Sequence, residues 1–215
     1  ESSRYTNLTQ PKQKANLIEK LGVDFLYEVF FNSEFGNLKP KDFVDQYIVG
    51  LHAKIVVAGY DYTYGKKDVA TMEKLPEFGE GRFEIVEVGE EKYSDETIGS
   101  TQIREYIKQG EIEKANAMLG YYYETTGIVI HGDARGRELG YPTANIYSHP
   151  YTLLPGIGIY AVWFSVKGKK YMGMASIGRN VTFKDNADIT VEVNILDFSE
   201  EIYGDEVEIE WVAHL

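Results

Sequence analysis

Along the second half of the chain, apolar and polar residues alternate with the two-residue period of half-buried β-strands. In "ITVEVNIL" (189–196), Thr190, Glu192 and Asn194 share one face, and the other is apolar, with Ile189, Val191, Val193 and Ile195. Comparable runs occupy 125–130, 158–166, 170–178 and 206–213, and "KGK" at 167–169 is typical of a hairpin turn. Several short strands separated by turn residues predict an antiparallel barrel or sandwich.

Residues 11–119 instead alternate helical and strand patterns. Amphipathic stripes predict helices at 9–22 and 39–53, and two short helices, broken near Gly110, at 100–120. Apolar runs predict buried strands at 23–31, 54–59 and 82–88. Strand–helix alternation favours a parallel α/β sheet. The change of pattern predicts two domains, residues 1–122 and 123–215.

Composition and charge narrow the classes of partner. The 215 residues are 43% hydrophobic and carry a formal net charge of −12. This acidic balance opposes binding to nucleic acid or to an anionic membrane, because both need clustered Lys and Arg. The chain contains no run of the ~18 apolar residues that a membrane span needs, and with no cysteine it has neither disulfides nor thiolate metal sites. We therefore expect small-molecule partners.

Residues 131–145, "HGDARGRELGYPTAN", concentrate glycine and charge in one short connection. The glycines let backbone amides approach a ligand closely, and consecutive amides in such a turn bind anions. Arginine adds charge, while Thr143 and Asn145 offer the hard oxygen ligands that suit Mg²⁺ accompanied by nucleotide phosphates. The residues alone are equally compatible with a glycine-rich connection whose arginines face water.

This stretch resembles the signature of riboflavin kinases, and "LPGIGIYAV", "ASIGRNVTF" and "VEVNILDFSEEIYGDEVEIEWV" resemble later segments of the same family, in order. The resemblance implies a Greek-key antiparallel β-barrel that phosphorylates riboflavin to FMN with ATP and Mg²⁺. It implies that Thr143 and Asn145 surround the metal. The residues that it assigns to the ATP phosphates are Gly132, Asp133, Arg135, Gly136, Arg137, Gly140, Thr143 and Asn145.

Glu192 occupies the position of the family's general base. A primary hydroxyl that attacks a γ-phosphoryl group needs a carboxylate to accept its proton. Without the resemblance, the pattern would predict that Glu192 is a solvated glutamate on the polar face of a strand. Two positions depart from the family pattern, since Ala134 replaces a basic or polar residue and Val181 replaces a proline.

The first half resembles an FMN adenylyltransferase, which makes FAD from FMN and ATP. "VVAGYDYTYG" and "IGSTQIREYI" carry this resemblance, with Gly99 in place of a serine. It implies a nucleotide or flavin site with Asp61 after a strand, and with Ser100, Thr101 and Arg104 at a helix start that attracts phosphate. Taken singly, the two motifs also fit a turn with aromatic packing and an ordinary capped helix.

FMN adenylyltransferases carry a His-x-x-His motif between their first strand and helix, and none of the four histidines here lies in such a context. The helix expected at the end of the riboflavin kinase family is not found before Leu215. We therefore expect an incomplete Rossmann-like nucleotidyltransferase domain in front of the barrel. The resemblance implies a bifunctional cytoplasmic parent protein, of which this chain alone adenylylates FMN poorly. The alternative function is a catalytically impaired flavin- or nucleotide-binding regulatory module.

Overall fold

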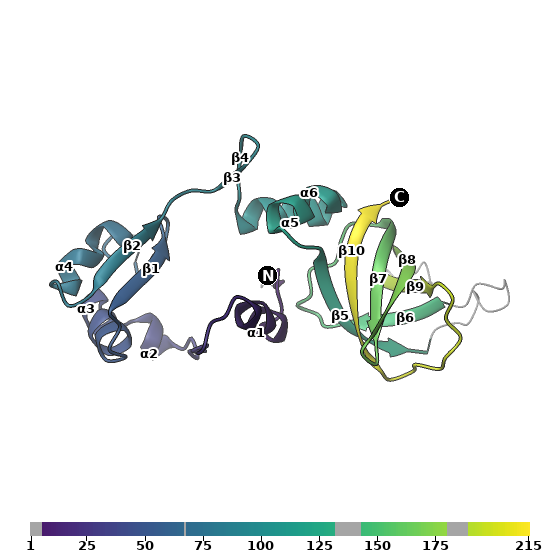
Figure 1. Ribbon diagram of the computed structural model, residues 1–215, viewed down its shortest axis with the longest axis horizontal. Coiled ribbons are helices and arrows are strands. Elements are labelled where there is room, and N and C mark those ends of the chain that lie inside the picture. Colours follow the sequence, from purple (N-terminus) through teal and green to yellow (C-terminus); the bar gives the residue numbers. More distant parts are fainter. Residues whose placement is uncertain (1–5, 67, 132–142, 180–188) are drawn as a thin grey trace. The chain divides into compact units, whose positions relative to one another are not determined.

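The structure is a computed structural model that describes residues 6–66, 68–131, 143–179 and 189–215. The chain divides into two compact units. One consists of residues 1–23 and 98–215, and the other of residues 24–97. Figure 1 labels the helices and strands of both. The domain boundary expected between residues 122 and 123 remains a prediction.

Six antiparallel strands close into a barrel in the first unit (Figure 1). Their order around the barrel is β10-β5-β6-β9-β8-β7. Strand β10 returns beside β7 after the consecutive strands β7, β8 and β9, which is the Greek-key connection. The strands are β5 (Tyr123–Ile130), β6 (Thr143–Ser148), β7 (Gly158–Val166), β8 (Lys169–Arg179), β9 (Ile189–Ile195) and β10 (Glu206–His214). The predicted Greek-key barrel is therefore confirmed.

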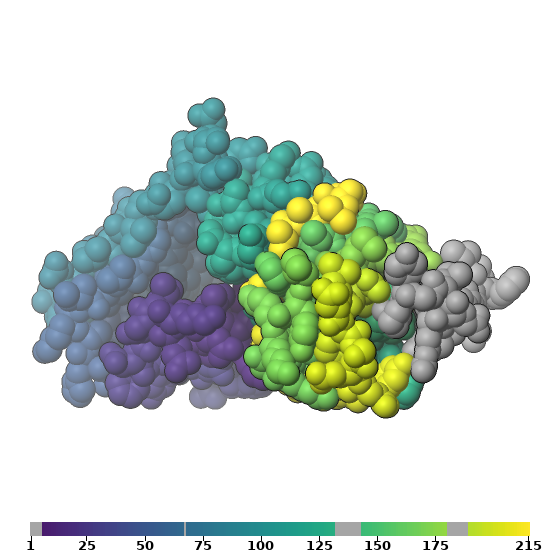
Figure 2. Space-filling model, turned by 45° about the vertical axis from the view of Figure 1, so that its right-hand side comes forward, coloured from purple at the N-terminus to yellow at the C-terminus, as the bar shows by residue number. Residues whose placement is uncertain are grey.

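The side chains that fill the barrel come from alternate residues of its strands. Val191 and Val193 on β9 are buried while Glu192 between them points outward, and the same pattern repeats on the other strands. Trp211 is fully buried, and its indole N–H donates to the Thr125 hydroxyl at 2.9 Å. In Figure 2 the residues coloured green to yellow, which include those of β7, β8, β9 and β10, lie next to one another.

In the described part of this unit, the helices are α1 (Pro11–Lys20), α5 (Ser100–Gln109) and α6 (Ile112–Leu119). Ile107 and Ile112 are fully buried in the same apolar cluster as the barrel core. The Asn116 side chain donates to the Trp211 carbonyl at 2.8 Å and accepts from the Tyr123 N–H at 2.7 Å. The predicted break at Gly110 is confirmed, because this glycine ends α5 with a φ of 78°.

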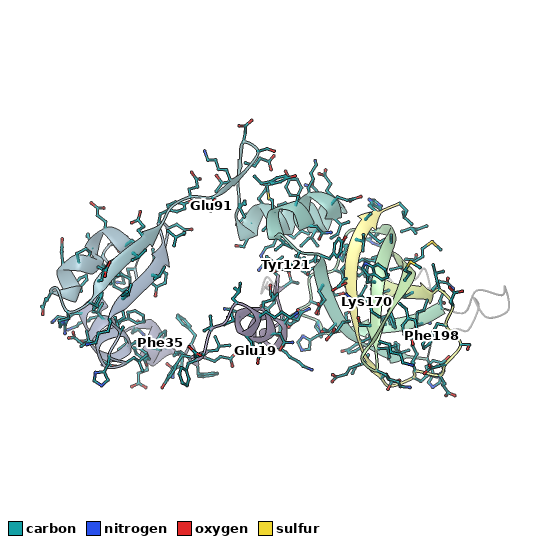
Figure 3. All side chains as sticks on the ribbon, viewed as in Figure 1. Glu19, Phe35, Glu91, Tyr121, Lys170 and Phe198 are labelled. Carbon is teal, nitrogen blue, oxygen red and sulfur yellow. The ribbon has the colours of Figure 1, made fainter. Side chains whose placement is uncertain are left out.

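Residues 24–97 form a smaller unit around a parallel pair of strands, β1 (Ile55–Gly59) and β2 (Glu84–Val88). The aromatic ring of Phe35, which Figure 3 labels, meets that of Tyr47 edge-on, and their ring centroids are 5.1 Å apart. The apolar cluster of this unit has the buried residues Val44, Tyr64, Ala70, Met72 and Leu75. Its other elements are α2 (Ser33–Gly36), α3 (Pro40–Phe43), η1 (Val44–Val49), η2 (Met72–Lys74), α4 (Leu75–Gly79), β3 (Lys92–Tyr93) and β4 (Glu96–Thr97).

One expectation about this part of the chain was wrong, and another was met in part. Residues 23–31 form no strand, and Phe25 and Phe30 are 88% and 84% exposed. An apolar run becomes a buried strand only where a sheet offers it a hydrogen-bonding partner, and none pairs with it among the described residues. The helix expected over 39–53 is confirmed from Pro40 to Val49, as α3 followed by the π-helix η1, but it ends before Leu51, which is exposed.

Candidate active site

Strands β6 and β9 bring the candidate chemistry of the barrel together. They pair in antiparallel fashion, with Asn145 directly opposite Glu192 and Thr143 opposite Asn194. Because Ile146 and Val191 point into the core, their neighbours Asn145 and Glu192 point out on the same side. Directly opposite residues of such a pair have Cβ atoms about 4.5–5.5 Å apart. Residues 47 positions apart in the sequence, Asn145 and Glu192, are thus neighbours.

Thr143 and Glu192 also make contact diagonally across the two strands. The Thr143 hydroxyl donates to the Glu192 carboxylate with 3.5 Å between oxygens. A hydroxyl oxygen that donates its proton still has lone pairs with which to accept or to bind a cation. Thr143 can therefore orient the carboxylate and act as an oxygen ligand at the same time.

Strand β8 extends this surface on the other side of Glu192. Ser176 lies opposite Glu192, and Met174 lies opposite Asn194. We call Thr143, Asn145, Ser176, Glu192 and Asn194 the polar patch. It joins one carboxylate to hydroxyl and amide groups on the outside of three adjacent strands. Such a set can accept a proton and bind hydroxyl or phosphate oxygens, but offers a single carboxylate.

Close approach of β5 to β6 helps to place the polar patch. Gly127 on β5 pairs with Ser148 on β6. A Cβ atom at position 127 would overlap the Ile146 side chain and lie 2.8 Å from the Tyr147 carbonyl oxygen. The absence of a side chain at Gly127 therefore allows β6 to lie where it does.

The oxygen atoms of the polar patch are the kind of ligand that suits a hard cation. Among the described residues, no three His, Cys, Asp or Glu side chains are grouped so that they could hold a metal ion. Thr143 and Asn145 supply neutral oxygens, the ligand type that Mg²⁺ accepts when phosphate oxygens and water complete its shell. The residues therefore suit a magnesium ion that arrives with a nucleotide rather than one held by the protein alone.

Most of the predicted phosphate ligands lie outside the described residues. These are Gly132, Asp133, Arg135, Gly136, Arg137 and Gly140, together with the departures at Ala134 and Val181. Of the predicted kinase residues, the structure describes Thr143, Asn145 and Glu192, and it places all three in the polar patch.

The adenylyltransferase-like residues divide between the two units. Asp61 follows β1 in the unit of residues 24–97, whereas Ser100, Thr101 and Arg104 belong to α5 in the other unit. Ser100 and Thr101 are exposed in the first turn of α5, as the sequence predicts. The Arg104 guanidinium donates to the Thr6 carbonyl at 2.5 Å, so part of its donor capacity is used within the protein.

The sequence reasoning missed Ser176 entirely and gave Asn194 no role. Asn194 was already assigned to the face of Glu192 by the alternation in β9. Ser176 is found only through the pairing of β8 with β9, which no local pattern specifies.

No helix in the described ranges is long and apolar enough to cross a membrane.

Comparison with known proteins adds independent support for the two-part reading. The riboflavin kinase family model matches residues 119–215, and the FAD synthetase model matches residues 1–102. A bifunctional riboflavin kinase/FMN adenylyltransferase of Listeria monocytogenes is 51% identical over 204 residues, which are 95% of this chain and 65% of the relative. The protein of the same description from Bacillus subtilis is 43% identical over 210 residues, 97% of this chain and 66% of the relative.

A solved structure is also similar to this chain. The crystal structure of a Streptococcus pneumoniae protein described as a macrolide-efflux protein matches with a TM-score of 0.89 and 38% identity, over 97% of this chain and 67% of the other. Together these matches define a class of proteins in which an FAD synthetase-type region precedes a riboflavin kinase-type barrel. The chain belongs to the family of bifunctional riboflavin kinases/FMN adenylyltransferases. It spans 65% and 66% of the length of the two relatives described above.

Proposed function

We propose that the barrel transfers the γ-phosphoryl group of ATP to the primary hydroxyl of riboflavin, which yields FMN and ADP. The observation that carries the proposal is the juxtaposition of Thr143 and Asn145 with the Glu192 carboxylate on paired strands. The riboflavin kinase family model covers all of these residues. The family relationship favours this enzyme over a catalytically impaired binding module.

Glu192 acts as the general base in this proposal. It accepts the proton of the riboflavin hydroxyl as the hydroxyl oxygen bonds to the γ-phosphorus and the bond to the bridging β,γ-oxygen breaks, so that ADP leaves. The Thr143 hydroxyl holds the carboxylate in orientation. The predicted residues between Gly132 and Gly140 bind the phosphates.

Thr143 and Asn145 would hold the Mg²⁺ that accompanies ATP, through the hydroxyl oxygen and the amide oxygen. The ion supplies charge neutralisation to the phosphate oxygens. Magnesium as the metal, ATP and flavins as substrates, and a cytoplasmic location are parts of this proposal.

The test incubates the wild type and Glu192→Gln with riboflavin, ATP and Mg²⁺. Chromatography then measures how much FMN each of them forms. Loss of the base lowers kcat by about 10²–10⁴-fold, while riboflavin binding persists. Glu208→Gln is the matched control, because Glu208 is an exposed glutamate on the outer face of β10, outside the polar patch. Equal turnover by wild type and Glu192→Gln would remove Glu192 from this role, and binding without turnover by the wild type would support the module.

For the whole protein we also propose adenylylation of FMN to FAD. The support is the FAD synthetase model over residues 1–102 and the bifunctional description of the relatives. The residues proposed to contact nucleotide or flavin are Asp61, Ser100, Thr101 and Arg104. Formation of FAD from FMN and ATP by the full-length protein, and its loss with Asp61→Ala, would test this assignment.

A further inference from the structure

A single row of outward-facing side chains crosses four neighbouring strands of the barrel, β6, β9, β8 and β7 (Figure 1). In this row Asn145 lies opposite Glu192. Ser176 lies on the other side of Glu192, and Ile159 lies opposite Ser176. The row therefore begins with the amide proposed to bind the metal, passes a carboxylate and a hydroxyl, and ends on an exposed isoleucine.

The barrel surface beside Ser176 is apolar. Met174 lies two positions from Ser176 on the same outer face of β8, since Ala175 between them is fully buried. Met174 and Ile159 are each 47% exposed, and Met172 continues the exposed face of β8. Methionine side chains are adaptable and polarisable, and they make favourable contacts with aromatic rings. This surface therefore suits a flat, largely apolar ring bound next to the Ser176 hydroxyl.

The side from which the acceptor approaches follows from the geometry of phosphoryl transfer. The attacking and leaving oxygens lie roughly in line through the phosphorus. In the proposed kinase, Thr143 and Asn145 on β6 hold the metal and its phosphates on one side of Glu192. The attacking hydroxyl then comes from the other side, where Ser176 on β8 lies opposite the carboxylate. Directly opposite residues have Cβ atoms about 4.5–5.5 Å apart, so one ligand can contact both side chains.

We propose that Ser176 is a specificity-determining residue, whose hydroxyl binds a secondary hydroxyl of the acceptor's chain while Glu192 accepts the proton of the primary hydroxyl. This inference rests on the proposed kinase function of the barrel. The ribityl chain of riboflavin carries its secondary hydroxyls between the primary hydroxyl and the ring system, and the row presents matching groups in the same order. The serine hydroxyl is exposed, and it can both donate and accept. The ring system then lies over Met174 and Ile159.

The test compares two acceptors in the full-length protein, riboflavin and a flavin whose side chain is ω-hydroxypentyl. The second acceptor keeps the primary hydroxyl and the ring system but lacks every secondary hydroxyl. Ser176→Ala lowers kcat/KM for riboflavin about three- to tenfold, the usual effect of losing one hydrogen bond. It leaves kcat/KM for the hydroxypentyl flavin within about twofold of the wild type, because that chain offers Ser176 nothing to bind. The KM for ATP stays unchanged with either acceptor.

Two further variants separate this role from general damage to the barrel. Ser165→Ala removes a partly exposed hydroxyl from the outer face of β7, outside the polar patch, and leaves kcat/KM for both flavins unchanged. Met174→Ala raises the KM for both flavins by a similar factor, because the two acceptors share the ring system. Melting temperatures of all variants show whether any of them has lost stability.

Three results would overturn the inference: an unchanged kcat/KM for riboflavin in Ser176→Ala, an equal loss with both flavins, or an unchanged KM for both flavins in Met174→Ala. Quenching of flavin fluorescence measures the binding of each acceptor without turnover. If the wild type forms no FMN, the proposed function fails. Weaker binding of riboflavin alone to Ser176→Ala would then still support the contact with the chain, and no difference between the two flavins would refute it.

Discussion

The barrel and the sheet of residues 24–97 differ in how completely their strands are paired and their apolar side chains are buried. Every barrel strand pairs with a neighbour on each side, and its inward residues are buried. In the smaller sheet, β1 and β2 pair only with each other among the described strands. Val56 and Ala58 pack on the apolar cluster, but Ile55 and Val57 on the opposite face are 55% and 61% exposed.

This difference bears on how well each candidate site is defined. Parallel strands are normally covered on both faces, whereas a closed antiparallel barrel needs no cover to complete its hydrogen bonds. Glu192 lies on a central strand whose two neighbours fix its position. Asp61 follows a strand with a single partner. The polar patch is therefore the better supported of the two candidate sites.

The largest effect is expected from Trp211→Ala, because it removes a fully buried indole from the barrel core. It should lower the free energy of unfolding by about 3–5 kcal/mol and leave the Thr125 hydroxyl without the indole N–H. Denaturant unfolding followed by circular dichroism measures the loss. The control is Trp163→Ala, which truncates the partly exposed tryptophan on the outside of β7 and should cost far less. Similar losses for both would contradict the account of the core.

Leu75→Ala should affect the smaller unit alone. Leu75 is fully buried in the cluster of residues 24–97, and its truncation should cost about 2–3 kcal/mol of local stability. Hydrogen exchange measured by mass spectrometry should show faster exchange in β1 and β2, with unchanged protection in β7 and β8. Equal loss of protection in the barrel would mean that the two units unfold as one.

A smaller, pH-dependent effect is expected at Glu124 on β5. Burial raises the pKa of this carboxyl above its ordinary value of 4.5, although a hydrogen bond from the Gln13 amide acts in the opposite direction. The folded state therefore binds the proton more tightly, and stability falls as pH rises from 4.5 through the raised pKa.

Replacement of this group by Glu124→Gln should remove this penalty at neutral pH, because the amide has no charge to bury. The melting temperature of the variant should exceed that of the wild type at pH 7 and approach it below the ordinary pKa. A gap that stays constant across this pH range would show that the charge is not the cause.

The smallest effect is expected from Val57→Thr on the exposed face of β1. Because this side chain is mostly in water, the change should alter stability by only a few tenths of a kcal/mol. Val44→Thr is the matched comparison, since it places a hydroxyl at a fully buried position and should cost about 1–3 kcal/mol. Thermal melts of both variants distinguish the covered from the uncovered part of this unit.

Local patterns predicted the elements whose own residues specify them. Alternation in 189–195 separated the buried face of β9 from its outer face, and the run at 206–213 is a strand as expected. Lys167 and Gly168 adopt the positive φ angles of the expected hairpin. Strand β6 was missed, because the motif chemistry of Thr143 and Asn145 suggested a loop and the strand is only six residues long. The opposite error was made at residues 23–31, where a strand was predicted and none is found. An apolar run does not specify a partner strand.

The residue types of the candidate site were predictable, but their arrangement was not. The motif pointed to Thr143, Asn145 and Glu192 separately. Their contact depends on β6 pairing with β9, a long-range choice made by the closure of the whole barrel. For the same reason Ser176 could not be assigned to the polar patch from sequence.

Gly127 has a consequence that reaches beyond its own strand. Any side chain at this position would push β6 outward from β5, and the displacement would be passed along β6 to Thr143 and Asn145. Because Asn145 on β6 lies directly opposite Glu192 on β9, such a shift would also change the distance between these two side chains. A residue outside the polar patch can therefore alter its geometry, and even a single added methyl group at position 127 would meet backbone atoms of β6.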